Sequence, residues 1–213
     1  MKKKLLAFVL CLGLGLTGCG SEIAEVSTAF DEAGNYIHIS NLRTTYSPVS
    51  LPYSVPYNES ELIFDSVDVY QDKYNSEYQV YVLITLNTSN LTEDEYHWLC
   101  EEDIEYESCS IKSEENNFDE DLSYRGKITG DNSLTLVFYN RNGYRNSVEG
   151  YDISAQIWIQ QQEMATYENS EGEIAEGNRS HDVLLTFEDI KPQSTNDIPE
   201  NIYNAMLELF SVS

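Results

Sequence analysis

Apolar and polar residues alternate with a period of two along much of the chain, which is the pattern of β-strands that bury one face. The clearest run covers residues 78–87, and similar runs predict strands at 36–39, 61–71, 104–111, 122–129, 133–139, 151–162 and 181–190. The faces expected to be buried comprise Tyr78, Val80, Val82, Ile84 and Leu86, then Ile153, Ala155, Ile157 and Ile159, and finally Val183, Leu185 and Phe187. The 16 tyrosines also favour strands.

Two of these runs predict local geometry as well. In 61–71 the apolar positions change parity around Asp65, which indicates a β-bulge. The runs 122–129 and 133–139 are separated by Gly130-Asp131-Asn132, which predicts a hairpin with a three-residue loop. That hairpin would place its apolar residues on one face by pairing Ile128 with Leu134, Gly126 with Leu136 and Tyr124 with Phe138.

Helical patterns are confined to two segments. Thr92 and Glu95 have the spacing of a capping box, which predicts one or two helical turns up to Leu99. A clearer helix is predicted over 198–211, with Ile202, Met206, Leu209 and Phe210 on its apolar side. Prolines at every fourth position from Pro48 to Pro56 exclude helix and strand interior, so 43–58 is expected to be irregular and extended.

Many short strands, few helices and no alternation of strands with helices predict an all-β fold, an antiparallel sandwich. The length suits one domain of ordinary size. We expect this domain to cover 36–213, with its short C-terminal helix at 198–211, and no internal repeat divides it.

The first twenty residues differ from the rest of the chain. Lys2, Lys3 and Lys4 precede an apolar run over residues 5–16, the layout of a secretory signal. Twelve helical residues span about 18 Å, which is too short for a hydrocarbon core of about 30 Å. The run therefore predicts an export signal rather than a permanent membrane helix.

The export signal ends in Leu16-Thr17-Gly18-Cys19, which resembles the lipobox of bacterial lipoproteins. The resemblance covers about a tenth of the chain and implies that residues 1–18 are removed. It also implies that the thiol of Cys19 carries a diacylglyceryl group, and two acyl chains suffice for stable anchoring. Residues 19–35 would then be a polar tether, and the domain would lie on the extracytoplasmic face of the cell membrane. The domain is similar in size, predicted location and strand pattern to the immunoglobulin-like domains of small Gram-positive lipoproteins.

Charge narrows the choice of partners. The chain has 37 acidic and 12 basic residues, a formal charge of −25, and loss of the signal would remove three of those basic residues and no acidic one. Such a negative field repels nucleic acid and anionic headgroups, so binding to either through charge is excluded. The simplest expectation is that this charge provides solubility and spacing on a crowded surface, and the alternative is capture of cations or of a basic protein.

Two cysteines stay in the domain after Cys11 leaves with the signal and Cys19 is lipidated. Cys100 and Cys109 could pair outside the cytoplasm, where closing so short a loop contributes about 2.5–3 kcal/mol. Pairing requires a helix followed by a strand between them, because a tight hairpin would place Ile104 opposite Cys100. The sequence does not decide between a disulfide and two free thiols.

One aromatic residue suggests a ligand platform. The parity of 151–162 places Trp158 outward beside Gln156 and Gln160, and an exposed tryptophan between amides suits ring stacking on a sugar. The simpler expectation is that the C-terminal helix or the proline-rich segment covers Trp158.

Metal and catalytic signals are weak. Glu93, His97 and Glu101 would lie on one helix face, but one helix supplies an incomplete ligand set, and a solvated acidic face is expected. The residues Asn117, Asp119 and Asp121 alternate like the start of a calcium loop, yet the glycine and the glutamate of that loop are missing. No nucleophile, zinc, phosphate or dinucleotide motif occurs, so we expect no catalytic residues and no cofactor.

The sequence therefore predicts a lipid-anchored, non-catalytic binding or accessory domain for protein interactions in the cell envelope. The alternative is a glycan-binding surface module that uses Trp158 and the tyrosines.

Overall fold

The computed structural model describes residues 20–30, 36–57, 60–74, 76–100, 108–115, 117–140, 143, 147–168 and 174–211. These ranges are mostly strand. The strands are β1 (Gly20–Phe30), β2 (Tyr36–Val49), β3 (Tyr53–Tyr57), β4 (Ser60–Tyr74), β5 (Glu77–Asn87), β6 (Ser108–Ser113), β7 (Phe118–Thr129), β8 (Ser133–Tyr139), β9 (Ile153–Glu168), β10 (Ile174–Ile190) and β11 (Gln193–Ser194). The helices are α1 (Glu93–Cys100), the 3₁₀ turn η1 (Thr195–Asp197) and α2 (Glu200–Ser211).

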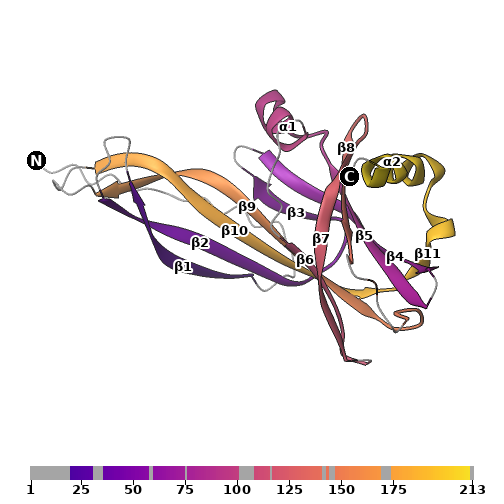
Figure 1. Ribbon diagram of the computed structural model, residues 1–213. Coiled ribbons are helices and arrows are strands. Elements are labelled where there is room, and N and C mark those ends of the chain that lie inside the picture. Colours follow the sequence, from indigo (N-terminus) through magenta and orange to yellow (C-terminus); the bar gives the residue numbers. More distant parts are fainter. Residues whose placement is uncertain are drawn as a thin grey trace, which may run out of the picture.

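The described strands form one continuous sheet in the order β1-β2-β10-β9-β6-β7-β8-β5-β4-β11, with β3 paired to β4 (Figure 1). Two pairings are parallel, β2 with β10 and β4 with β11. The expectation of a purely antiparallel arrangement is therefore wrong. Side-chain alternation fixes which face of a strand is buried, but it does not fix the direction of the neighbouring strand.

Strand β7 connects the two halves of the sheet. Its first part, Phe118 to Leu122, pairs with β6, and its second part, Ser123 to Thr129, pairs with β8. Two separate sheets, as in an immunoglobulin-like sandwich, are therefore not confirmed. The β-rich class with a short C-terminal helix is confirmed.

One apolar core fills the space between the two halves of the sheet. Phe64 on β4 and Phe187 on β10 meet across it, with ring centroids 5.7 Å apart. The predicted inward residues of three strands lie in this core, except Tyr78, which is only half-buried; the others are Val80, Val82, Ile84, Leu86, Ile153, Ala155, Ile157, Ile159, Val183, Leu185 and Phe187. The period-two pattern thus identified the buried faces correctly.

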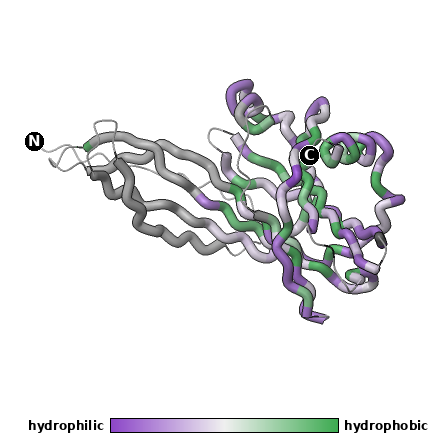
Figure 2. Tube along the Cα trace, viewed as in Figure 1, coloured by the Kyte–Doolittle hydropathy of each residue, from purple (hydrophilic) through white to green (hydrophobic). Residues whose placement is uncertain are grey.

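Helix α2 covers the outer face of the β4–β5–β8 half and creates a second apolar cluster. Met206 is buried there against Leu83 and Val137, and Ile202, Leu209 and Phe210 pack around it. Figure 2 shows apolar residues on α2 and on the strands beside it. The predicted apolar side of the C-terminal helix is confirmed, although the α-helix begins at Glu200 rather than at 198.

Strand β7 approaches α2 closely at Gly126. A Cβ atom there would lie 2.9 Å from Leu209 Cδ2, and the φ of Gly126 is +157°. The neighbouring Arg125 donates from Nη2 to the Leu209 carbonyl oxygen, and its guanidinium lies 5.1 Å from the centroid of the Phe210 ring. The glycine therefore allows the helix to sit against the strand.

Helix α1 is held by a buried carboxylate. The predicted capping box is confirmed, because Thr92 N donates to Glu95 Oε2 at 2.9 Å and Glu95 N donates to Thr92 Oγ1 at 3.3 Å. Ser60 Oγ donates to the same Glu95 oxygen at 2.6 Å and so ties the helix to β4. Tyr57 is buried nearby, and this burial, assisted by Glu95 and Cys100, raises its pKa to about 12.

The two predicted local features have different outcomes. The bulge in β4 is confirmed, since the register with β5 shifts between Phe64 and Ser66. The β7–β8 hairpin register is wrong next to the loop, where Thr129 rather than Ile128 pairs with Leu134. Gly130 N donates to Ser133 O at 2.8 Å, which closes the turn more tightly than the expected three-residue loop.

A bulge then restores the expected register further along β7. It lies between Tyr124 and Gly126, so Tyr124 pairs with Phe138 as predicted, whereas Gly126 pairs with Val137 instead of Leu136. Leu136 faces the main core and Val137 faces α2, and both are fully buried. The apolar pattern could not select the register because β8 is buried on both faces.

Two segments predicted to be irregular contain strands. The 43–58 segment includes the end of β2 and all of β3, in which Pro56 is tolerated because β3 pairs with β4 alone among the described strands. The predicted tether also differs, because β1 begins at Gly20 and pairs with β2 along its whole length, from Gly20 opposite Tyr46 to Phe30 opposite Tyr36. Isoleucine, valine and threonine suit β1 to a strand.

Candidate functional site

The predicted platform lies on the outer face of β9. Ile157 and Ile159 are buried, Gln156 is exposed and Trp158 is half-buried, an alternation that agrees with the predicted outward direction of Trp158. The indole Nε1 of Trp158 is itself buried. The Gln160 side chain lies outside the described part of the chain. In the neighbouring strands, Trp158 is opposite Leu184 of β10 and Ser108 of β6.

The C-terminal helix does not lie over this platform. It packs against Leu83 and Val137, on the other half of the sheet from β9 (Figure 1). The expectation that this helix covers Trp158 is therefore wrong. Gln156 makes a long hydrogen bond from Nε2 to Thr186 Oγ1 at 3.4 Å, which orients its amide across β9 and β10.

Cys100 and Cys109 are both buried in the main core and are present as thiols. Cys100 is the last residue of α1 and Cys109 lies in β6, which is the helix-then-strand arrangement that pairing requires. The structure does not contain the disulfide. Burial, and secondarily the nearby Asp121, raises the pKa of the Cys109 thiol, so this thiol is a poor nucleophile.

The candidate metal ligands are not brought together. Glu93 and His97 are exposed on α1, and Glu101 lies outside the described residues. Asp119 is opposite Lys112 on β6, and Asp121 is opposite Ser110. Within the ranges that the structure describes, no group of three or more histidine, cysteine or acidic side chains is placed to hold a metal ion.

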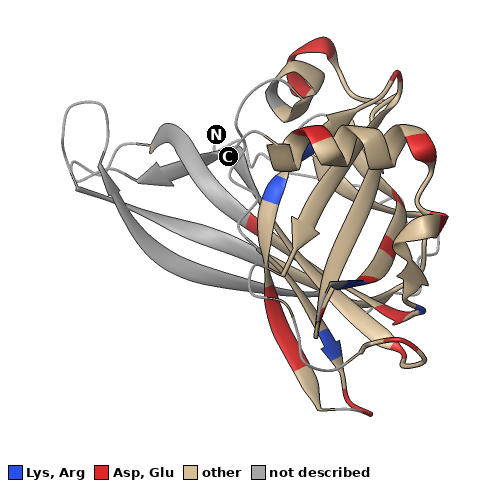
Figure 3. Ribbon diagram, turned by 45° about the vertical axis from the view of Figure 1, so that its right-hand side comes forward, with Lys and Arg blue, Asp and Glu red and all other residues tan. Residues whose placement is uncertain are grey.

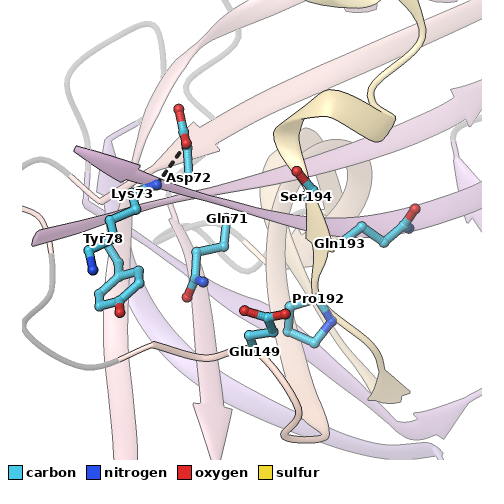
Figure 4. Close-up of a pocket in the computed structure, with 8 residues that line it drawn as sticks. All are labelled: Gln71, Asp72, Lys73, Tyr78, Glu149, Pro192, Gln193 and Ser194. Atoms are coloured by element: carbon cyan, nitrogen blue, oxygen red, sulfur yellow. Dashed lines mark hydrogen bonds between the residues drawn. The ribbon is translucent and has the colours of Figure 1, made fainter.

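A polar pocket of about 340 Å³ lies where β4 and β5 meet β11 (Figure 4). The structure places Lys73 Nζ 5.6 Å from the centroid of the Tyr78 ring, and Asp72 Oδ1 accepts a hydrogen bond from Lys73 N at 2.7 Å. The pocket is lined by Gln71, Asp72, Lys73, Tyr78, Glu149, Pro192, Gln193 and Ser194. This pocket could not be predicted from the sequence, because its walls come from three separate parts of the chain.

Gln71 fixes one wall of this polar pocket. Its Nε2 donates to Ser147 Oγ at 2.9 Å, and its Oε1 accepts from Val148 N at 2.7 Å. These bonds hold the loop that carries Glu149 against β4. The pocket offers amide, hydroxyl and carboxylate groups beside one aromatic ring, which suits hydrogen bonding to a small polar ligand.

A second pocket, of about 380 Å³, lies where β6, β9 and β10 have neighbouring ends. We call it the acidic pocket. Its lining residues are Lys112, Ser113, Glu114, Glu115, Asp152, Ile153, Ser154, Glu188 and Asp189. Lys191, beside the pocket, forms an ion pair with the lining residue Asp152. In the ribbon of Figure 3, acidic residues (red) are spread over the described strands, helices and loops, and basic residues (blue) are far fewer.

Comparison with known proteins adds no relative. No family model, no curated protein and no solved structure matches the chain. In the part of the chain that the structure describes, no helix has both the length and the apolar character needed to cross a membrane. Cys19, the predicted lipid attachment site, lies outside the described residues.

The described sites are suited to binding. The platform has a half-buried indole beside an exposed amide, the polar pocket has hydrogen-bonding groups, and the acidic pocket has negative charge. The platform was found from strand parity, whereas neither pocket left a local signal in the sequence.

Proposed function

We propose that this chain is a bacterial lipoprotein, anchored through Cys19 on the extracytoplasmic face of the cell membrane. Its domain binds a protein partner in the cell envelope and has no catalytic activity of its own. The observation that carries the anchoring is the order of a basic start, a short apolar run and Leu16-Thr17-Gly18-Cys19. Thr17 and Gly18 are small enough to let a peptidase cut just before the lipidated thiol.

The binding role is supported by charge and by the shape of the described surface. A formal charge of −25 favours association with a basic partner and speeds the encounter at low salt. The two pockets are mostly polar and are lined by residues of strands and short loops. A relationship to immunoglobulin-like domains belongs to the same proposal, and it is supported by the high strand content and by one apolar core between the two halves of the sheet.

Replacement of Cys19 tests the anchor. Cys19→Ser should move the protein from the membrane fraction to the soluble fraction and abolish incorporation of labelled palmitate. Cys11→Ser removes the other leader cysteine and is the matched control, which should leave both properties unchanged. A Cys19→Ser protein that still fractionates with membranes and still takes up label would refute the proposal.

Crosslinking on intact cells tests the binding role. A specific protein partner should be captured by the parent protein, and its yield should fall as the salt concentration rises, because exposed charges are screened. If the purified protein instead turns over an envelope substrate, the non-catalytic part of the proposal fails.

Glycan binding is the second candidate, and the outward Trp158 beside the exposed Gln156 favours it. Retention on a polysaccharide column should be lost in Trp158→Ala, because ring stacking contributes most of the contact with a sugar face. Tyr203→Ala, which removes an exposed aromatic residue on α2, is the control and should be retained like the parent. Equal retention of both variants would exclude the platform.

A further inference from the structure

The acidic pocket gathers negative charge from separate elements. Five carboxylates line it, contributed by the β6–β7 turn, the start of β9 and the end of β10, namely Glu114, Glu115, Asp152, Glu188 and Asp189. Lys112 also lines the pocket, and Lys191 lies beside it. The acidic groups therefore outnumber the basic ones among the described residues, and the pocket attracts cations.

Lys191 shows that the carboxylates of the acidic pocket can stabilise an ammonium group. Lys191 pairs with Asp152 through Nζ and Oδ1. The pKa of Lys191 is raised, first by the hydrogen bond to Asp152 and also by Glu115 and Asp189. An exposed ammonium group is thus stabilised at the rim by carboxylates from three different segments.

Ser113 supplies an independent observation. It lines the pocket, its side chain is only 2 % exposed, and its hydroxyl oxygen has no hydrogen-bond partner in the described structure. An unsatisfied buried hydroxyl destabilises a protein, so a donor that enters the pocket would relieve this penalty. Neither Lys112, which is exposed, nor Lys191, which is bound to Asp152, provides that donor.

A metal ion does not fit these side chains. In the described ranges no three acidic, histidine or cysteine side chains converge as metal ligands. An organic cation requires less convergence, because an ammonium or guanidinium group presents several N–H donors to carboxylates that are spread apart. The side chain of lysine or arginine is the commonest such group in a protein partner.

We propose that the acidic pocket binds a lysine or arginine side chain of a basic segment in the partner protein, with Ser113 accepting a hydrogen bond from it. The proposal rests on the protein-binding role proposed above and names where the partner docks. The occupant is a basic protein segment rather than a nucleic acid or an anionic membrane, both of which the charge of the chain repels.

Binding of a fluorescein-labelled decalysine peptide to the detergent-solubilised full chain tests this proposal by fluorescence anisotropy. The double variant Glu115→Gln, Glu188→Gln should bind about tenfold more weakly, as expected for two partly exposed ion pairs. The control Glu200→Gln, Glu208→Gln removes the same charge from the exposed surface of α2 and should change the affinity less than about threefold. Ser113→Ala, which removes no charge, should weaken binding several-fold.

Hydrogen exchange measured with and without the peptide locates the contact. Protection should appear in 112–115, 152–154 and 188–189. Equal weakening in the two double variants, or a Ser113→Ala protein that binds as tightly as the parent, would overturn the proposal and show nonspecific attraction. Because the assay uses purified protein, these results are separate from the Cys19→Ser and crosslinking tests. A crosslinked partner that binds the pocket variants normally would refute the pocket alone.

Discussion

The buried phenol of Tyr57 predicts a loss of stability at high pH. Its pKa is about 12 in the folded protein, raised first by burial and then by Glu95 and Cys100, whereas an unfolded tyrosine titrates near 10. A group whose folded pKa is raised stabilises the fold fully below the unfolded pKa, and this contribution is lost as the pH rises through the folded pKa.

The size of the effect follows from the shift. A difference of about two pKa units corresponds to about 2.7 kcal/mol once the pH exceeds the folded pKa. About half of this, roughly 1.4 kcal/mol, should be lost by pH 11, because the unfolded chain ionises Tyr57 there while the folded chain does not. Below pH 9 the contribution should be constant.

Urea unfolding at pH 8.5 and at pH 11, followed by tryptophan fluorescence, measures this difference. The other tyrosines and the lysines also titrate, so the quantity that matters is the difference between the parent and Tyr57→Phe. The parent should lose about 1.4 kcal/mol more than Tyr57→Phe between the two pH values. Identical losses in the two proteins would refute the reasoning, because they would mean that Tyr57 is not buried as the structure describes.

Three further predictions concern packing and the thiols. Met206→Ala should lower the free energy of unfolding by about 2–4 kcal/mol in urea titrations, because Met206 on the inner side of α2 is only 3 % exposed. Gly126→Ala should lower it by about 1–3 kcal/mol, and Leu209→Ala in the same chain should reduce that penalty, since the added Cβ would lie 2.9 Å from Leu209 Cδ2. Alkylation without reductant, followed by peptide mapping, should label Cys100 and Cys109 only after unfolding, because both are buried thiols; a linked pair of peptides would contradict this.

Strand positions could be predicted because alternation along one strand is a local property. Val80 to Leu86 and Ile153 to Ile159 are examples, and their inward residues all lie in the core. Strand order could not be predicted, because β2 and β10 lie side by side although more than a hundred residues separate them. The same limit applies to the polar pocket and the acidic pocket, whose walls come from distant segments.

Other failures have local causes. The β7–β8 register was wrong because Leu136 and Val137 are adjacent and both buried, so the pattern gave no preferred face. The proline-rich segment was predicted to be irregular because prolines exclude central strands, but β3 pairs on one side only among the described strands. The burial alternation around Trp158 agrees with its predicted parity, but α2 does not cover it. The position of α2 depends on apolar residues on the outer side of β5 and β8, which the pattern along β9 does not reveal.

The start of β1 at Gly20, opposite Tyr46, bears on how far a lipid-anchored domain can reach. A flexible tether over 19–35 would let the domain explore a hemisphere of about 20 Å radius. If Cys19 carries the lipid while Gly20 is already paired in the sheet, that freedom disappears and the body is held at the bilayer surface in a narrow range of orientations. Its search for partners is then confined to molecules that lie in the same thin layer above the bilayer. Restricting encounters in this way raises the effective concentration of the right partner without any new contact.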